Sequence, residues 1–225
     1  MVQHLNTALQ HLATAFVPAV LGIMLHEVAH GWAAYKMGDP TAERSGWLTL
    51  NPLKHIDPLG LCVFVFTALA APFTIGWAKP VPIQPRLFRN PRAGMILVSL
   101  AGPLANFLTA CLCALVVKLA LNLLTADFPG SEALFFIAGS AREGMFINVA
   151  LAWFNLMPVP PLDGSHILAG LLPAAVARMY ASLARLGMVI VILLVAAGLL
   201  RRVLVPLMIV SIEFIDALFN LGQRM

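Results

Sequence analysis

The sequence predicts an all-α polytopic membrane protein with about five to six transmembrane helices. Of its 225 residues, 60% are hydrophobic and only 11% are charged, and the mean hydropathy is +0.90. A soluble domain carries about 25% charged residues, so this chain has too few polar side chains to cover its own surface. Several apolar runs also reach the length of about 20 residues that a membrane-spanning helix needs. The composition therefore indicates lipid as the solvent.

The apolar runs divide the chain into six segments within one membrane-embedded domain, residues 1–225. We expect them at about 5–36, 59–78, 94–124, 132–157, 181–200 and 203–221. The second segment differs from the others because Gly60, Pro72 and Gly76 interrupt it, and such residues disfavour a continuous helix. Cys62, Cys111 and Cys113 lie in apolar sequence and predict no disulfide framework.

The charges of the loops predict an orientation. Residues 76–93 carry four basic side chains and no acidic one, whereas 123–132 carries Asp127 and Glu132 and no basic one. Cytoplasmic loops are enriched in Lys and Arg. We therefore expect 76–93 in the cytoplasm and 123–132 outside. The net charge of +4 indicates no nucleic-acid partner, because the basic residues form short clusters between apolar runs and do not alternate with aromatic residues.

The flanks of the second segment conflict with a single crossing of the membrane. Residues 36–54 carry Lys36, Arg44 and Lys54, so both flanks of 59–78 are expected on the cytoplasmic side. We predict that 59–78 is a re-entrant element or a short β-hairpin between the first helix and the helix that contains 101–106. The alternative is a plain spanning helix that leaves the basic residues of 36–54 outside.

The pentapeptide His26-Glu27-Val28-Ala29-His30 is the chemically informative part of the first segment. A spacing of four residues places both imidazoles on one helix face, where they can bind the same tetrahedral zinc ion. Glu27 then lies beside the metal, where it can accept a proton from a water at the metal and pass it to a leaving amine. The alternative is a pair of helix histidines with a surface glutamate. That alternative is costly, because ionisable groups on a membrane helix cost several kcal/mol unless they face a polar interior.

Two histidines leave a zinc ion short of ligands, and Asp163 is the candidate for the third. It follows Pro158, Pro160 and Pro161 and precedes Gly164, so a break in the chain can turn its carboxylate toward the interior of the bilayer. An aspartate that caps a helix starting near Ser165 explains the local sequence equally well.

Further motifs follow the pentapeptide within about residues 20–170. They are Asn51-Pro-Leu-Lys-His-Ile-Asp-Pro58, Gly76-Trp-Ala-Lys-Pro-Val-Pro82, Ala101-Gly-Pro-Leu-Ala-Asn106 and Asn155 through Gly164. Together and in this order, the motifs resemble those of the site-2 protease family of intramembrane zinc metalloproteases. The resemblance is to compact prokaryotic members without PDZ or CBS domains.

The resemblance implies one zinc ion held by His26, His30 and Asp163, with Glu27 as the catalytic base. It also implies that Asn155 hydrogen-bonds the substrate or the oxyanion near the metal. The implied activity is endoproteolysis of transmembrane or signal-peptide-like segments, as in regulated intramembrane proteolysis. We expect a multi-pass protein of the cytoplasmic membrane with its active site toward the cytoplasm. The catalytic core would span about 5–172, and a C-terminal helical pair about 178–221.

Several interpretations stay open at the level of the sequence. A membrane metal transporter or sensor could use the same ligands without hydrolysis, although it would need no base at Glu27. Asn106 could hydrogen-bond across helices, and His55 is either a gate or an ordinary loop residue. Arg142 and Glu143 either mark the polar edge of a membrane segment or pair with partners. A β-element within 44–56 or 62–82 could hold an unwound substrate by strand addition.

Overall fold

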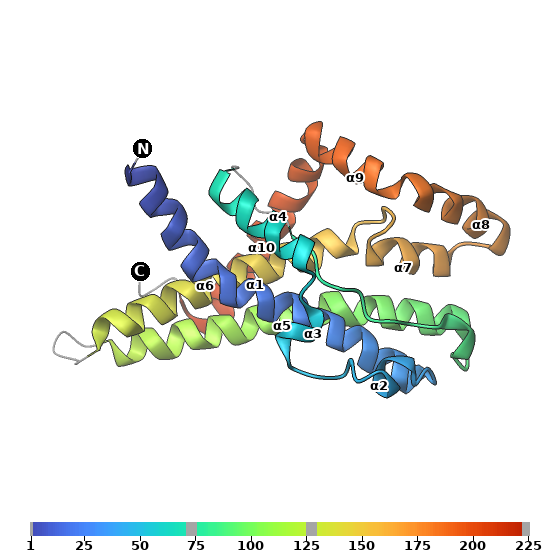
Figure 1. The fold of residues 1–225 in the computed structure, drawn as a ribbon, viewed down its shortest axis with the longest axis horizontal. Coiled ribbons are helices and arrows are strands. Elements are labelled where there is room, and N and C mark those ends of the chain that lie inside the picture. Colours follow the sequence, from blue (N-terminus) through green and yellow to red (C-terminus); the bar gives the residue numbers. More distant parts are fainter. Residues whose placement is uncertain (1, 71–75, 125–129, 222–225) are drawn as a thin grey trace.

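Helices dominate the fold (Figure 1), a computed structural model that describes residues 2–70, 76–124 and 130–221. The only strand-like pairing among these residues is an isolated antiparallel bridge between Ile56 and Ala78. The helices are α1 Val2–Met37, α2 Thr41–Arg44, α3 Pro52–His55, α4 Pro58–Ala70, α5 Pro91–Leu123, α6 Ser131–Leu156, α7 Asp163–Leu171, α8 Ala174–Ser182, α9 Gly187–Ala196 and α10 Leu199–Phe219, with short 3-10 turns at Pro85–Leu87 and Leu183–Leu186.

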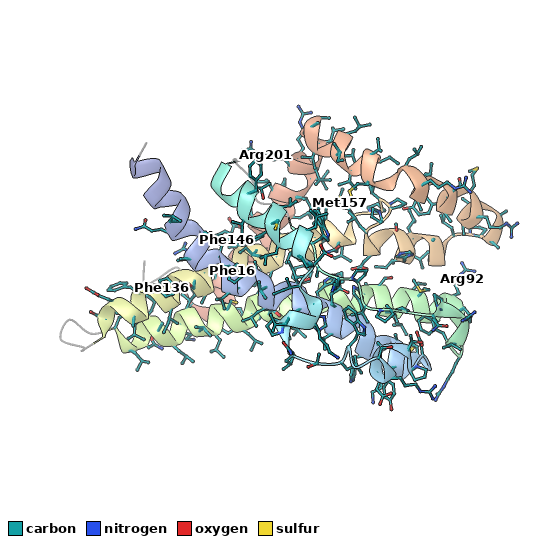
Figure 2. The ribbon with its side chains drawn as sticks, in the orientation of Figure 1. Phe16, Arg92, Phe136, Phe146, Met157 and Arg201 are labelled. Carbon is teal, nitrogen blue, oxygen red and sulfur yellow. The ribbon has the colours of Figure 1, made fainter. Side chains whose placement is uncertain are left out.

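Four helical stretches are long and apolar enough to cross a membrane, namely Leu12–Met37, Pro91–Leu123, Ser131–Leu156 and Ala174–Ala196. Large apolar side chains such as Phe136, which is 53% exposed, cover their outer faces (Figure 2). The protein is therefore a multi-pass membrane protein. The expected count of five to six spans is not confirmed among the described residues. The last helix, α10, is 21 residues long but carries two arginines and two acidic residues.

The second expected segment forms only the short helix α4, which has 13 residues. At about 1.5 Å per residue, α4 is shorter than the roughly 30 Å of a hydrocarbon core. Gly60 and Gly76 allow its close approach to the returning chain, because a Cβ at Gly60 would lie 2.2 Å from the Trp77 carbonyl oxygen. Residues 71–75, which include Pro72, lie outside the described residues, so re-entry and a hairpin both stay predictions.

Three long helices form the core around which the other elements pack. Helices α5 and α6 run side by side, and α1 crosses them (Figure 1). Small residues line the contacts: a Cβ at Gly144 of α6 would lie 2.9 Å from Pro18 of α1 and 2.8 Å from Cys113 of α5. Because lipid provides no hydrophobic drive between helices, small residues that allow close packing stabilise such a bundle.

The segment that precedes α5 is tied to the end of α1 by Asp39, whose side chain is buried. Its carboxylate accepts hydrogen bonds from the backbone N–H of Thr41 at 2.9 Å, from the Thr41 hydroxyl, and from the backbone N–H of Gln84 at 2.6 Å. Burial raises the pKa of Asp39, but these hydrogen bonds outweigh burial and lower its pKa below the usual value. The ionised carboxylate therefore stabilises the fold.

We expect Asp39→Asn to lower the free energy of unfolding at pH 7 by about 2 kcal/mol, since hydrogen bonds to a charged group are lost. The melting temperature should fall accordingly. A carboxyl whose pKa is lower in the folded state stabilises the fold above its unfolded pKa of about 3.9. This contribution is lost as the pH falls through the folded pKa, so the difference between the two proteins should shrink there. Thermal unfolding in detergent from pH 7 to pH 3 measures the difference. Exposed Glu43 offers Glu43→Gln as the control, and an equal difference at all pH values would contradict the prediction.

Helix α7 is held against the start of α5 by Arg92. The guanidinium of Arg92 donates to the carbonyl oxygens of Gly170 and of Leu172, the latter at 2.9 Å. These carbonyls end α7, where a cation is favoured by the helix dipole. A Cβ at Gly170 would lie 2.5 Å from Ile96, so the two helices also touch closely. The N-terminal end of α7, with Asp163, is thereby fixed relative to α5.

Candidate metal centre

His26 and His30 lie one helical turn apart on α1, and each is only 7% exposed. Their Nε2 atoms lie 2.9 Å apart, so both rings point at one spot, as the spacing of four residues predicts. The Nδ1 atom of His30 lies 2.7 Å from the carbonyl oxygen of Val98. The Nδ1 atom of His26 lies 2.6 Å from Oδ1 of Asn106. Both acceptors are on α5.

These two contacts determine which ring nitrogens carry protons. A carbonyl oxygen only accepts, so Nδ1 of His30 must donate, and the neutral ring then has its lone pair on Nε2. The same holds for His26 with the amide oxygen of Asn106. A hydrogen bond from the distal ring nitrogen to a carbonyl is the usual way in which a metal-binding imidazole is oriented.

Asp163 completes the cluster from α7. Its Oδ2 atom lies 3.2 Å from Nε2 of His26 and 3.2 Å from Nε2 of His30. The helix that it begins has Leu162 at its N-cap. Oδ2 is buried and has no hydrogen-bond partner among the described residues. The structure therefore turns this oxygen toward the histidines, as a ligand would require, and away from the capping position.

The three converging atoms fit a small cation. The Nε2 lone pairs of the two histidines and a carboxylate oxygen meet in a buried site. These electron-rich atoms repel one another unless a positive charge lies between them. His26, His30 and Asp163 are also the one group of three potential ligands found together among the described residues. Tetrahedral zinc with bonds of about 2.0–2.1 Å separates its ligand atoms by roughly 3.3 Å, close to the distances here. Three protein ligands leave the fourth position open, as in catalytic zinc sites.

Glu27 lies on the next face of α1, and a neighbouring loop holds its carboxylate. Its Oε2 atom accepts the backbone N–H of buried Val81 at 3.0 Å. Val81 belongs to the segment that Asp39 fastens through Gln84. One oxygen of the Glu27 carboxylate is thus held in place by this loop.

Asn155 is half-buried in the last turn of α6. Its amide Nδ2 donates to the carbonyl of Leu151 in the same helix at 3.0 Å. The structure thus places Asn155 on the helix that leads to Asp163, with its side-chain amide bonded within that helix.

The sequence analysis did not single out two residues near this centre, Gly102 and Asn148. A Cβ at Gly102 would lie 2.5 Å from Cε1 of His26 and 2.5 Å from Nε2 of His30, so only glycine leaves room for the rings. Asn148 of α6 is fully buried and accepts a hydrogen bond from Asn106. Gly102 lies inside the Ala101–Asn106 motif, which could have indicated it, whereas Asn148 belongs to no motif that the sequence analysis found.

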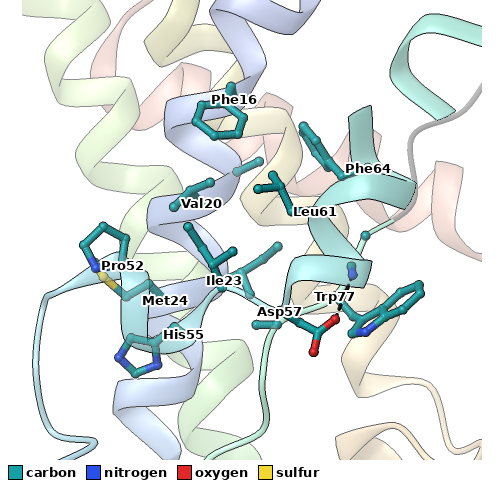
Figure 3. Close-up of a pocket in the computed structure, with 15 residues that line it drawn as sticks. Phe16, Val20, Ile23, Met24, Pro52, His55, Asp57, Leu61, Phe64 and Trp77 are labelled. Atoms are coloured by element: carbon teal, nitrogen blue, oxygen red, sulfur yellow. Dashed lines mark hydrogen bonds between the residues drawn. The ribbon is translucent and has the colours of Figure 1, made fainter. Parts of the chain in front are cut away.

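An apolar pocket lies beside the Glu27 face of α1 (Figure 3). Phe16, Val20 and Ile23 of α1 face Leu61 and Phe64 of α4 across it. Trp77 and Ala78 also line the pocket. The rings of Phe16 and Phe64 meet edge to face at 6.2 Å. Residues 16, 20, 23 and 27 recur at helical spacing, so the pocket begins about one turn from Glu27.

His55, which also lines the pocket, is buried and is not an exposed loop residue. Its Nε2 atom donates to the carbonyl of Thr49 at 3.0 Å, and its ring meets Trp47 edge to face at 5.6 Å. Its backbone carbonyl accepts the N–H of Lys79 at 2.8 Å. These contacts stabilise the loop that precedes α4.

Comparisons with known proteins agree with a hydrolytic metal centre. The profile of peptidase family M50 matches residues 139–198. "Putative zinc metalloprotease YwhC" of Bacillus subtilis is 35% identical over 208 residues, which cover 91% of this chain and 90% of that protein. "Putative zinc metalloprotease Rip2" of Mycolicibacterium smegmatis is 34% identical over 186 residues, covering 81% of this chain and 66% of that protein. No solved structure matches the chain.

The apolar helical bundle and its buried histidine–aspartate cluster define a membrane metalloenzyme, and the relatives specify which kind. The chain belongs to peptidase family M50, the site-2 protease family. It is a zinc-dependent protease, and the expectation from its motifs is confirmed at this level.

Proposed function

We propose that this protein is an intramembrane endopeptidase that cleaves transmembrane or signal-peptide-like segments of other proteins. One zinc ion is bound by His26, His30 and Asp163, Glu27 is the catalytic base, and Asn155 donates a hydrogen bond to the oxyanion. The observation that carries the proposal is the convergence of two Nε2 atoms and one carboxylate oxygen, all within 3.2 Å of one another. The two histidines lie on α1, which is long and apolar enough to cross a membrane, and the carboxylate comes from the short helix α7.

The residues divide the chemistry of peptide hydrolysis between them. A bound zinc ion polarises the scissile carbonyl and lowers the pKa of water. Glu27 accepts the proton of the attacking water at Oε1, while the N–H of Val81 holds Oε2, and it then transfers the proton to the leaving amine. Asn155 uses one of the two N–H donors of its amide within α6, and the other can donate to the oxyanion. Such a donor contributes about 3 kcal/mol in comparable sites.

The substrate segment is proposed to bind along residues 76–81. This stretch runs from the apolar pocket at Ala78 to Val81 over Glu27, and it is already extended enough to bridge Ile56. A helical peptide bond is shielded by its own hydrogen bonds, so the substrate must unwind. An extended substrate can pair with such a backbone and place an apolar side chain in the pocket, which favours membrane-derived sequences.

The protein is proposed to lie in the cytoplasmic membrane with the metal centre toward the cytoplasm. The basic residues of 76–93 support this orientation, because that segment packs directly over the Glu27 end of α1. Water must reach a centre that lies below the lipid surface, and the polar backbone of this segment offers a route from the cytoplasmic side.

Removal of zinc tests the proposal. We expect purified protein in liposomes to cleave a reconstituted transmembrane peptide, to lose this activity with a chelator, and to regain it with one equivalent of zinc. His26→Ala, His30→Ala and Asp163→Ala should each lose both zinc and activity, because three ligands hold the ion. Mass spectrometry of the products and metal analysis of the protein measure the two effects.

The alternative function, a metal transporter or sensor, predicts different results in the same liposomes. A transporter would move zinc across the bilayer and leave the peptide intact. Zinc flux without cleavage, in protein that has its full complement of zinc, would contradict the proposal. Flux measurements with a fluorescent zinc indicator inside the liposomes distinguish the two functions.

A further inference from the structure

Asn148 has no role in the chemistry proposed above, yet it is fully buried in a membrane helix. A buried amide is costly unless all of its polar atoms are hydrogen-bonded. Its Nδ2 atom donates to the carbonyl of Gly144 at 2.9 Å, and its Oδ1 atom accepts from Asn106 at 2.9 Å. A Cβ at Gly22 would lie 2.5 Å from Oδ1 of Asn148, so glycine at this position of α1 leaves room for the amide.

The hydrogen bonds form a chain that runs from α6 through α5 to α1. The carbonyl oxygen of Gly144 can only accept a hydrogen bond, so the side-chain amide of Asn148 must direct Nδ2 toward Gly144. Its Oδ1 atom therefore faces Asn106. Asn106, also fully buried, then has both N–H donors engaged, by Oδ1 of Asn148 and by the carbonyl of Gly22 at 3.1 Å. Its own Oδ1 is the atom that remains to face Nδ1 of His26.

The orientation of the Asn106 amide matters for the metal because it determines the tautomer of His26. With Oδ1 toward the ring, Nδ1 is protonated and Nε2 has a free lone pair. A rotated amide would present an N–H to Nδ1 and favour a proton on Nε2, and that tautomer cannot bind a metal through Nε2.

We propose that Asn148 is a positioning residue for the zinc site, which acts through Asn106 to hold His26 in the metal-binding tautomer. Its place in the sequence, on α6 between Gly144 and Asn155, couples the packing of that helix to the affinity of the site. This inference rests on the proposed function in one respect, namely that His26 binds zinc through Nε2.

Zinc affinity, measured by competition with a chromophoric chelator, tests the role without relying on activity. Asn148→Leu should weaken zinc binding about 10-fold, and Asn106→Leu by up to about 100-fold, the range found for residues that orient metal ligands. If Asn148 acts only through Asn106, Asn148→Leu should change the affinity less than about twofold in an Asn106→Leu background. Asn148→Asp should retain the affinity, because a neutral carboxyl in this buried site offers the same acceptor and donor.

Thr109→Val is the matched control, because Thr109 is a buried polar residue of α5 whose hydroxyl donates to the Ala105 carbonyl of its own helix. It should leave the zinc affinity unchanged. If Asn148→Leu does not fold, Asn148→Ala replaces it in each comparison with the same expectations. The proposal is overturned if the Asn148 variant binds zinc as tightly as the unchanged protein. It is also overturned if the Asn148 substitution weakens zinc binding equally in the unchanged protein and in the Asn106→Leu background, since that shows a merely structural effect.

His26→Ala separates this inference from the proposed function. If His26→Ala binds zinc with unchanged affinity, the ligand assignment itself is wrong. If His26→Ala loses zinc while Asn148→Leu does not, the ligand assignment stands and only the positioning role is excluded.

Discussion

Glu27→Gln should lower kcat/KM for a transmembrane peptide by about 10²–10⁴-fold, the contribution typical of a positioned general base, and leave zinc binding unchanged. The amide oxygen of glutamine can still accept the N–H of Val81, which lies 3.0 Å from Oε2 of Glu27. The substitution therefore keeps the shape and the loop contact and removes only the ability to take a proton. Single-turnover cleavage in liposomes and metal analysis of the same preparation measure the two quantities.

The control for this variant is Glu43→Gln, which removes an exposed carboxylate from α2, in the loop that follows α1. It should cleave at the rate of the unchanged protein. Undiminished cleavage by Glu27→Gln would exclude Glu27 as the base. Loss of zinc together with activity would instead indicate that Glu27 supports the metal, which is not what the geometry predicts.

Gly102→Ala should reduce zinc affinity by on the order of 100-fold or more, at least the effect of losing an orienting contact. The added methyl group would lie 2.5 Å from atoms of both imidazoles, well inside van der Waals contact. The rings cannot move away from the added methyl group without breaking their hydrogen bonds to Val98 and Asn106. The metal-binding geometry must therefore change. Chelator competition measures the loss, and activity should fall with it.

The result is diagnostic because alanine favours a helix over glycine by about 0.8–1.0 kcal/mol. Helix α5 should therefore form at least as well in the variant, and circular dichroism should show undiminished helix content. Gly139→Ala is the matched control, since nothing lies within 4 Å of a Cβ at Gly139 in α6, and it should bind zinc normally. Normal zinc binding by Gly102→Ala would mean that Gly102 does not adjoin the metal site.

The sequence predicted the long helices well because the length of an apolar run and the tendency to form a helix are local properties. The expected segments at 5–36, 94–124 and 132–157 agree within a few residues with α1, α5 and α6. It was less informative for 59–78, where the breakers Gly60 and Gly76 prove to be contact points between α4 and the returning chain. A glycine in a sequence does not reveal whether it ends a helix or admits a neighbour.

By itself, the sequence determined that the chain belongs in a membrane and that His26 and His30 share a helix face. The first follows from composition and the second from the 3.6-residue repeat of a helix, and neither requires knowledge of distant contacts. Only the tertiary structure placed the Asp163 carboxylate beside both histidines, and only it brought Gly102, Asn148 and Val81 close to this cluster. Those contacts depend on how α5, α6 and α7 pack against α1, which is determined by side chains far apart in the chain.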